Sequence, residues 1–253
     1  MRFMRLISNE LLKLHVRRKN YIFIGFLLAI TVAAGLIMKQ TMHGLTAYGF
    51  AAKLQPVLNY PILLFMIIYG AQTIAEEFKE GTIKQLLIRP PSRSVILLSK
   101  YATGVTVMTG ILLFSCLASI ITGLVLFENS DDYTLLTVFK SFLYAVPSDL
   151  FYFTLALLIG TAVASVPLAL SLSIILHLVG GGISAMIAKY EWSKFIVLNH
   201  LNLRHFDSDP HIGGTGASPY PDINLFGSLL INAVYLAAFL VLACYVFYRK
   251  EVK

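Results

Sequence analysis

Charged residues are scarce in this sequence. They make up 13% of its 253 residues, whereas 57% are hydrophobic and the mean hydropathy is +0.76. A soluble core does not need so much apolar material, so the composition excludes an ordinary soluble domain. The apolar stretches are continuous instead of alternating, which excludes an outer-membrane β-barrel. Because each helical crossing needs about 20 apolar residues, we expect an all-α polytopic membrane protein with about five to seven spans.

Cysteine is also rare. The two cysteines, Cys116 and Cys244, lie within apolar runs, where a free cysteine behaves as a small buried hydrophobic residue. They predict neither a disulfide framework nor a metal site. No base-reading motif is present, and the net charge of +7 is accounted for by topology and anionic lipid. We therefore expect no nucleic-acid partner.

Six apolar runs predict six transmembrane helices. The third and fourth are longer than about 20 residues, so they must tilt, kink or project beyond the hydrocarbon. Pro147 predicts a kink in the fourth. The runs are residues 21–38, 58–75, 101–127, 135–164, 167–188 and 225–248.

Lysine and arginine predict the orientation. With the amino terminus inside, 14 of the 20 basic residues fall in the leader, in the loop between the second and third spans, or at the C terminus, all on the cytoplasmic side. By the positive-inside rule, both termini are expected in the cytoplasm. The remaining six fall outside or near an outer boundary: Lys39, Lys53, Lys140, Lys189, Lys194 and Arg204.

Residues 1–19 are predicted to form an amphipathic helix that lies in the headgroup layer before the first span. An ordinary positively charged flank is the alternative interpretation. The apolar residues of the leader recur at spacings of three and four, as Phe3, Leu6, Ile7, Leu11 and Leu14.

The stretch EEFKEGTIKQLLIRPPSR, residues 76–93, interrupts the apolar chain between the second and third spans. Gly81 and Thr82 predict a break followed by the cap of a second short helix, which Pro90 and Pro91 end. On that helix Ile83, Leu86 and Leu87 share one face, while Lys84, Gln85 and Arg89 lie on the others. A short cytoplasmic helix with a small apolar face suits a groove on a partner protein. A second interfacial helix on lipid is the alternative.

Four segments carry a resemblance to a known family: NELLKLHVRRKNYI, EEFKEGTIKQLLIRPPSRSVILLSK, FIVLNHLNLRHF and YLAAFLVLACYVFYRKEVK. The chain resembles the type 2 permeases of ATP-binding-cassette transporters, closest to the bacitracin-transport and lantibiotic-immunity branch. The likeness covers essentially the whole chain, and the central loop is its most specific part. It implies a single transmembrane domain over residues 1–253 in the plasma membrane of a Gram-positive bacterium.

The resemblance also implies a function: export or clearance of a peptide antibiotic or another amphiphile, hence antimicrobial peptide resistance. In the family, two permease chains, identical or related, each dock a cytoplasmic ATPase. The leader corresponds to the connecting helix and the loop of residues 76–93 to the coupling helix. The coupling positions carried over to this sequence are Glu76, Glu77, Phe78, Gly81, Thr82, Ile83, Leu86 and Leu87.

The ATPase must be another polypeptide, because this chain has no G-x-x-x-x-G-K-[ST] phosphate loop. We therefore expect no enzyme activity in this chain alone and no cofactor of its own, with ATP and magnesium bound by the partner subunit.

Two residues within the spans are candidates for the translocation path. Asp149 is a carboxylate within the fourth run, where a charge is costly and suggests a function; it can instead face a polar cavity, cap a helix broken at Pro147, or lie near the outer boundary. His177 lies in the fifth run beside Gly180. It can titrate or bind cargo, or make a hydrogen bond to a neighbouring helix.

Residues 189–224 form the longest outer segment. We expect a polar extracellular cap over the exit of the path, partly re-entrant through the FIVL stretch. The spacing of its histidines and aspartates fits no structural zinc pattern, so no metal site is predicted. These residues are His200, His205, Asp207, Asp209 and His211.

Two other functions compete with the transporter subunit. Paired glutamates such as Glu76 and Glu77 occur in an intramembrane protease family, but the arginine that its motif requires is replaced by Gly81. An ion-driven secondary transporter usually has inverted repeats, and no convincing repeat relates residues 1–128 to residues 129–253.

Overall fold

A computed structural model of the chain describes residues 2–16, 19–79, 81, 92–128, 133–213, 216, 220 and 222–250. In these residues the regular structure is helical, with no β-strand among them. Six helical segments are long and apolar enough to cross a membrane, which confirms the predicted number. They are α2 (Lys19–Thr41), α3 (Ala47–Lys79), α5 (Arg93–Leu126), α6 (Leu135–Leu143) together with α7 (Val146–Val163), α8 (Val166–Ile187) and α9 (Leu225–Arg249).

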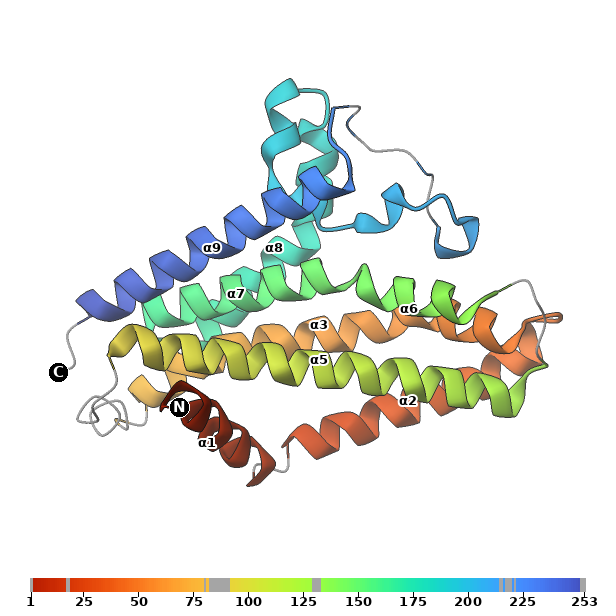
Figure 1. Cartoon of the computed structure of the whole chain (residues 1–253), viewed down its shortest axis with the longest axis horizontal. Helices are drawn as coiled ribbons and strands as arrows, with labels where there is room; N and C mark the ends of the chain where they lie inside the picture. Colours follow the sequence, from red (N-terminus) through yellow and green to blue (C-terminus); the bar gives the residue numbers. More distant parts are fainter. Residues whose placement is uncertain are drawn as a thin grey trace.

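The long helices run roughly along one axis, and both termini lie at the same end of the molecule (Figure 1). That end, called the terminal end below, contains α1 (Arg2–Val16), the end of α3, the start of α5 and the ends of α7 and α9. At the opposite end, α2 leads into α3. Among the described residues that follow α8 are four short 3₁₀ helices: η1 (Glu191–Phe195), η2 (Val197–His200), η3 (Leu203–Phe206) and η4 (Pro210–Ile212).

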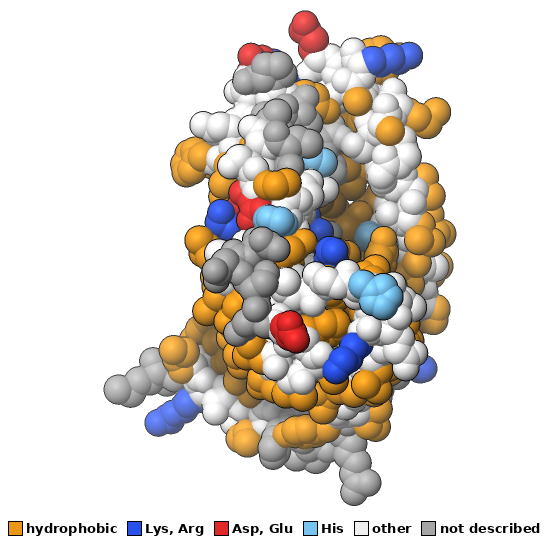
Figure 2. Space-filling model, turned by 90° about the vertical axis from the view of Figure 1, so that its right-hand side faces the viewer, with side chains coloured by type: hydrophobic (Ala, Val, Ile, Leu, Met, Phe, Trp, Pro, Cys, Tyr) orange, Lys and Arg blue, Asp and Glu red, His pale blue; other side chains and the backbone are white. Residues whose placement is uncertain are grey.

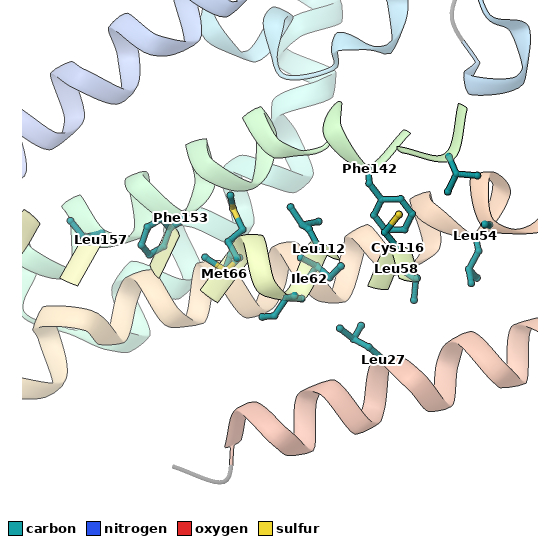
Figure 3. Packing of buried hydrophobic residues seen from close by; sticks show 14 of the residues in the cluster. Leu27, Leu54, Leu58, Ile62, Met66, Leu112, Cys116, Phe142, Phe153 and Leu157 are labelled. Atoms are coloured by element: carbon teal, nitrogen blue, oxygen red, sulfur yellow. The ribbon is translucent and has the colours of Figure 1, made fainter. Parts of the chain in front are cut away.

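The core lies where α3 packs against α5 and α7. Figure 3 shows its apolar side chains, which come from α2, α3, α5, α6 and α7 and include Leu27, Leu58, Leu112 and Phe153. Glycine lets the backbones approach closely here. A Cβ atom at Gly70 of α3 would lie 2.5 Å from the backbone oxygen of Phe153 on α7. Small residues at such crossings are the usual means of packing helices in a bilayer.

The predicted kink near Pro147 is confirmed as a break in the fourth span. Helix α6 ends at Leu143, Tyr144 and Ala145 form a turn, and α7 begins at Val146. Pro147 lies in the first turn of α7, where the missing N–H has no helical partner to lose.

The start of α3 differs from the sequence prediction. The apolar run begins at Leu58, but the helix begins at Ala47 and continues through Pro56 and Pro61. The added turns carry Gln55, which is 1% exposed and accepts a hydrogen bond from Arg204. Apolar periodicity does not detect these turns because their buried side chains include a polar one.

Candidate functional site

Four of the eight predicted coupling residues are described by the structure, and they lie at the terminal end. Glu76, Glu77 and Phe78 lie in the last turn of α3, and Gly81 follows with a φ of +69°, a left-handed conformation that favours glycine. Thr82, Ile83, Leu86 and Leu87 lie outside the described residues, so the short helix expected there stays a prediction. In the leader, residues Arg2–Val16 form the helix α1, whose place in the headgroup layer stays a prediction.

An ion cluster joins three helices beside this loop. Nζ of Lys100, on α5, lies 2.7 Å from Oε1 of Glu77 on α3 and 3.1 Å from Oε2 of Glu10 on α1. The side chain of Lys100 is 8% exposed, and those of the two glutamates are 16% and 18% exposed. Nζ of Lys13 lies 2.6 Å from the other oxygen of Glu10. Burial alone would raise the pKa of Glu10, but Lys100 and Lys13 outweigh it and hold that pKa below its usual range.

Sequence reasoning missed Lys100 and Glu10 as partners of Glu77. The signal available was the position of Lys100, a lone cation one residue before the third apolar run. A cation held away from water needs opposite charges nearby. Which carboxylates supply these charges depends on how α1 and α3 pack against α5. The spacing of residues along either helix does not predict that packing.

Phe78 and Arg93 flank residues 80–91, and both contact the C-terminal end of α9. The ring of Phe78 lies edge-on to that of Phe247, with centroids 6.3 Å apart. Nη1 of Arg93 donates to the carbonyl oxygens of Phe247, Tyr248 and Lys250 at 3.3, 3.0 and 2.8 Å. The two ends that flank the loop are therefore held by the same segment.

Asp149 is completely buried in the first turn of α7. Among the described residues, neither of its carboxylate oxygens has a hydrogen-bond partner. A buried polar group without a partner costs free energy, and an ionisable group at membrane depth marks a candidate functional site. Of the interpretations that the sequence left open, complete burial argues against an exposed boundary, and the lack of a donor to either oxygen argues against a helix cap.

His177 projects from α8 against two tyrosine rings. It meets Tyr152 of α7 edge-on at 4.9 Å between centroids and Tyr60 of α3 at 6.4 Å. Tyr152 is buried, whereas Tyr60 is 65% exposed. Asp149 and Tyr152 are one turn apart on α7 and so are neighbours on its surface. No hydrogen bond or ion pair joins Asp149 to His177 within the described chain.

Residues 188–213, called the strap below, run from the end of α8, at the top of the view, towards the end of the molecule opposite the termini (Figure 1). Figure 2 looks onto this end: hydrophobic side chains cover the flanks, while charged and histidine side chains gather around a central hollow. The strap thus collects much of the polarity that the spans lack. Among the described residues, no group of three or more histidine, cysteine, aspartate or glutamate side chains could hold a metal ion.

One anchor of the strap is His200, which is 1% exposed. Its Nε2 lies 2.7 Å from the carbonyl oxygen of Lys194, and its Nδ1 lies 2.8 Å from Oγ of Ser228 on α9. The carbonyl can only accept, so Nε2 carries the hydrogen and Nδ1 accepts from the serine hydroxyl. Burial lowers the pKa of His200, although the bond to Lys194 opposes this. Asn232 donates to the carbonyl oxygen of His200 at 2.8 Å.

The other anchor reaches α3 and α6. Arg204 donates to Gln55 of α3, and burial lowers the pKa of its guanidinium. Oδ2 of Asp207 accepts from the hydroxyl of Tyr144 at 2.7 Å and lies 3.0 Å from Nζ of Lys140. Burial would raise the pKa of Asp207, but these partners and the N–H of Asp209 lower it on balance. The strap therefore joins α9 to the α3–α6 side of the bundle.

These features define a polytopic helical membrane protein with a polar cluster at each end and an enclosed carboxylate on the fourth span. Residues 21–253 match the family described as “Protein of unknown function (DUF2705)”, and the chain belongs to that family. It is 30% identical over 228 residues to “Uncharacterized protein YhcI” of Bacillus subtilis (strain 168), which covers 82% of this chain and 70% of the relative. It is 25% identical over 238 residues to “Uncharacterized membrane protein YdbK” of the same organism, covering 90% of this chain and 92% of the relative.

Proposed function

We propose that this chain is the permease subunit of an ATP-binding-cassette transporter and that it is driven by a separate cytoplasmic ATP-binding subunit. The resemblance of four segments to type 2 permeases supports the proposal. One structural observation carries it: Glu77 and Arg93, on either side of residues 80–91, are both tied by charged contacts to other helices. A loop mounted in this way transfers force to the bundle instead of merely reversing the chain.

In this mechanism, ATP brings two nucleotide-binding subunits together, and their closure displaces the loop of residues 76–93. The displacement shifts the population between inward-facing and outward-facing arrangements of the helices. The coupling positions Glu76, Glu77, Phe78, Gly81, Thr82, Ile83, Leu86 and Leu87 would contact or support the subunit. ATP and magnesium belong to that partner.

The terminal end would face the cytoplasm, in agreement with the positive-inside rule, and α1 would lie in the headgroup layer of a bacterial plasma membrane. Two permease chains, identical or related, would enclose the path. The strap would then close its outer exit. The cargo would be a peptide antibiotic or another amphiphile, and Asp149 and His177 are the candidates to meet it.

Asp149 favours a second candidate function. A completely buried carboxyl group without a hydrogen-bond partner is also what an ion-driven secondary transporter uses to carry a proton or a cation. In that case transport would follow an ion gradient and need no ATP-binding subunit. The intramembrane protease has less support, because Glu77 is paired with Lys100 at 2.7 Å.

Co-purification tests the proposal. The tagged full chain is extracted from its native membrane under conditions that preserve complexes, and its companions are identified by mass spectrometry. We expect a stoichiometric ATP-binding subunit with the wild type and its loss with Leu86→Asp, because the charge would enter the apolar face predicted to bind the partner.

Gln85→Asp is the matched control. It adds the same charge one residue away, on a predicted polar face, and should retain the subunit. If the wild type brings no ATP-binding subunit, the transporter-subunit proposal is wrong and the ion-driven alternative becomes the leading one. Equal loss with both variants would show that the apolar face does not form the contact.

A further inference from the structure

The C-terminal end of α9 contacts more than the two sides of the loop. Nζ of Lys250 donates to the carbonyl oxygens of Thr161 and Ala162 at 2.7 and 2.8 Å. These carbonyls belong to the last turn of α7, which ends at Val163. Lys250 therefore caps a helix 88 and 89 residues earlier in the chain.

Arg93 makes the same kind of contact with α9. Arg93 is the first residue of α5, and its guanidinium donates hydrogen bonds to the carbonyl oxygens of Phe247, Tyr248 and Lys250. The last carbonyls of a helix have no partner within it, and a cation placed there also meets the negative end of the helix dipole. Arg93 thus caps α9, and its bond to the carbonyl of Lys250 fixes the residue that caps α7.

Phe78 completes the arrangement from the other side of the loop. Nζ of Lys250 lies 4.8 Å from the centroid of its ring, within the range of a cation–π contact. The same ring packs edge-on against Phe247. Both flanks of the loop therefore touch residues 247–250, and those residues contact the ends of two different spans.

We propose that residues 247–250 are a linkage through which the loop of residues 76–93 moves α9 and α7 together. Arg93 and Lys250 are its positioning residues: Arg93 holds the linkage to α5, and Lys250 extends it to α7. The role in transport rests on the proposed function, whereas the linkage is a property of this chain alone. It gives the loop a direct connection to α7, the helix that carries Asp149 and the aromatic partner of His177.

The linkage predicts a directional pattern of effects. Losing Lys250 should free the end of α7 while Arg93 still caps α9. Losing Arg93 should free the end of α9 and also that of α7, because Lys250 is then no longer positioned. If each cation capped only the helix end that it contacts, loss of Arg93 would free the end of α9 and leave the end of α7 unchanged. Among the hydrogen bonds and ion pairs of the described residues, Arg93 makes no contact with α7.

Hydrogen–deuterium exchange of the full chain in lipid nanodiscs tests this pattern. For Arg93→Gln we expect exchange about tenfold faster at the amides of both 161–164 and 246–249, as expected when charge-assisted hydrogen bonds are lost. For Lys250→Met we expect the increase at 161–164 only. Arg93→Lys, which keeps the charge with different donor geometry, should give a smaller increase at both sites.

Arg249→Gln is the matched control, because Arg249 is an exposed cation on the same helix end and lies over the ring of Tyr245. It should leave 161–164 at the wild-type rate. Slow amide exchange at residues 58–66, in the core of α3, reports whether each variant is folded. If Arg93→Gln is not folded, exchange at 161–164 in Arg93→Lys tests the linkage instead. Wild-type exchange at 161–164 in a folded Arg93 variant would overturn the linkage.

A second measurement uses the native complex with its ATP-binding subunit. ATP should change exchange at 161–164 in the wild type, and Arg93→Gln should remove that change while ATP hydrolysis continues. A nucleotide response that persists in folded Arg93→Gln would overturn the role of the linkage in transport. Absence of any ATP-binding subunit would instead overturn the proposed function, leaving the measurement on the chain alone to decide the linkage.

Discussion

The ammonium group of Lys100 and the carboxylate of Glu77 lie 2.7 Å apart, which ties the start of α5 to the end of α3 directly beside the loop. Glu10 of α1 approaches the same ammonium at 3.1 Å. One largely buried cation therefore holds α1, 90 residues earlier in the chain, together with the two helices that flank the loop. The proposed coupling through the loop needs such fixed contacts, because a loosely held loop would move without moving the helices.

Lys100→Met should be strongly destabilising. It would leave two mostly buried carboxylates without their common partner, and breaking such a cluster from one side costs about 3–5 kcal/mol. Lys13→Met is the control, because Lys13 pairs with the same Glu10 but its side chain is 55% exposed, and an exposed pair contributes about 1 kcal/mol or less. Thermal unfolding in nanodiscs would measure both. Similar shifts for the two variants would contradict the buried cluster.

Gly70→Ala should destabilise the crossing of α3 and α7. The new Cβ would lie 2.5 Å from the backbone oxygen of Phe153, and a backbone atom cannot rotate away, so we expect a loss of about 1–3 kcal/mol. At Gly110 of α5 nothing lies within 4 Å of the added Cβ. Gly110→Ala should be neutral or stabilising by up to about 1 kcal/mol through helix propensity. Denaturant titration of both variants compares the two sites.

Asp149→Asn should separate stability from function. Asparagine has nearly the same size as aspartate and cannot ionise, so the melting temperature should stay close to the wild-type value, while transport falls if Asp149 serves the path. Thr154→Val is the control on the same helix. Its hydroxyl is buried and lies 3.1 Å from that of Tyr101, so its loss should cost about 1 kcal/mol. A large drop in melting temperature for Asp149→Asn would mean that the carboxyl group stabilises the fold.

The strap should weaken in mild acid. Because burial lowers the pKa of His200, the unfolded chain binds its proton more readily than the folded chain does. The contribution of His200 is thus full above about pH 6.5, the ordinary histidine pKa, and decreases as the pH falls below it. Fluorescence of Trp192, the single tryptophan, reports on the strap two residues from Lys194.

His200→Gln provides the control for this titration. Glutamine can hydrogen-bond but does not titrate, so the fluorescence change between about pH 7 and pH 5 should disappear while the strap stays in place. An identical pH profile in wild type and variant would assign the change to another group.

The spans and the break in the fourth could be predicted from the sequence because each is a local property. Continuous apolar runs are long enough to cross a bilayer, and Pro147 marks the start of α7. The early start of α3 could not be predicted from the sequence, because the burial of Gln55 depends on its hydrogen bond to Arg204, 149 residues later. Periodicity indicates which face of a helix is apolar but not which helix covers it.

Of the candidate site, the sequence could locate only part. Glu77 and Phe78, selected as coupling residues, lie in the last turn of α3 beside the loop, and their role in coupling stays a prediction. It did not find Arg93 or Lys250 as helix caps, because their partners are backbone carbonyls that every residue possesses. The identity of such a partner is decided by packing alone.

Native mass spectrometry of the complex released from its own membrane shows whether this chain works with an ATP-binding polypeptide. We expect an assembly of two copies of this chain or a related one with two copies of an ATP-binding polypeptide, and loss of that polypeptide alone in Leu86→Asp. A stable assembly that contains this chain without any ATP-binding polypeptide would rule out the proposed function.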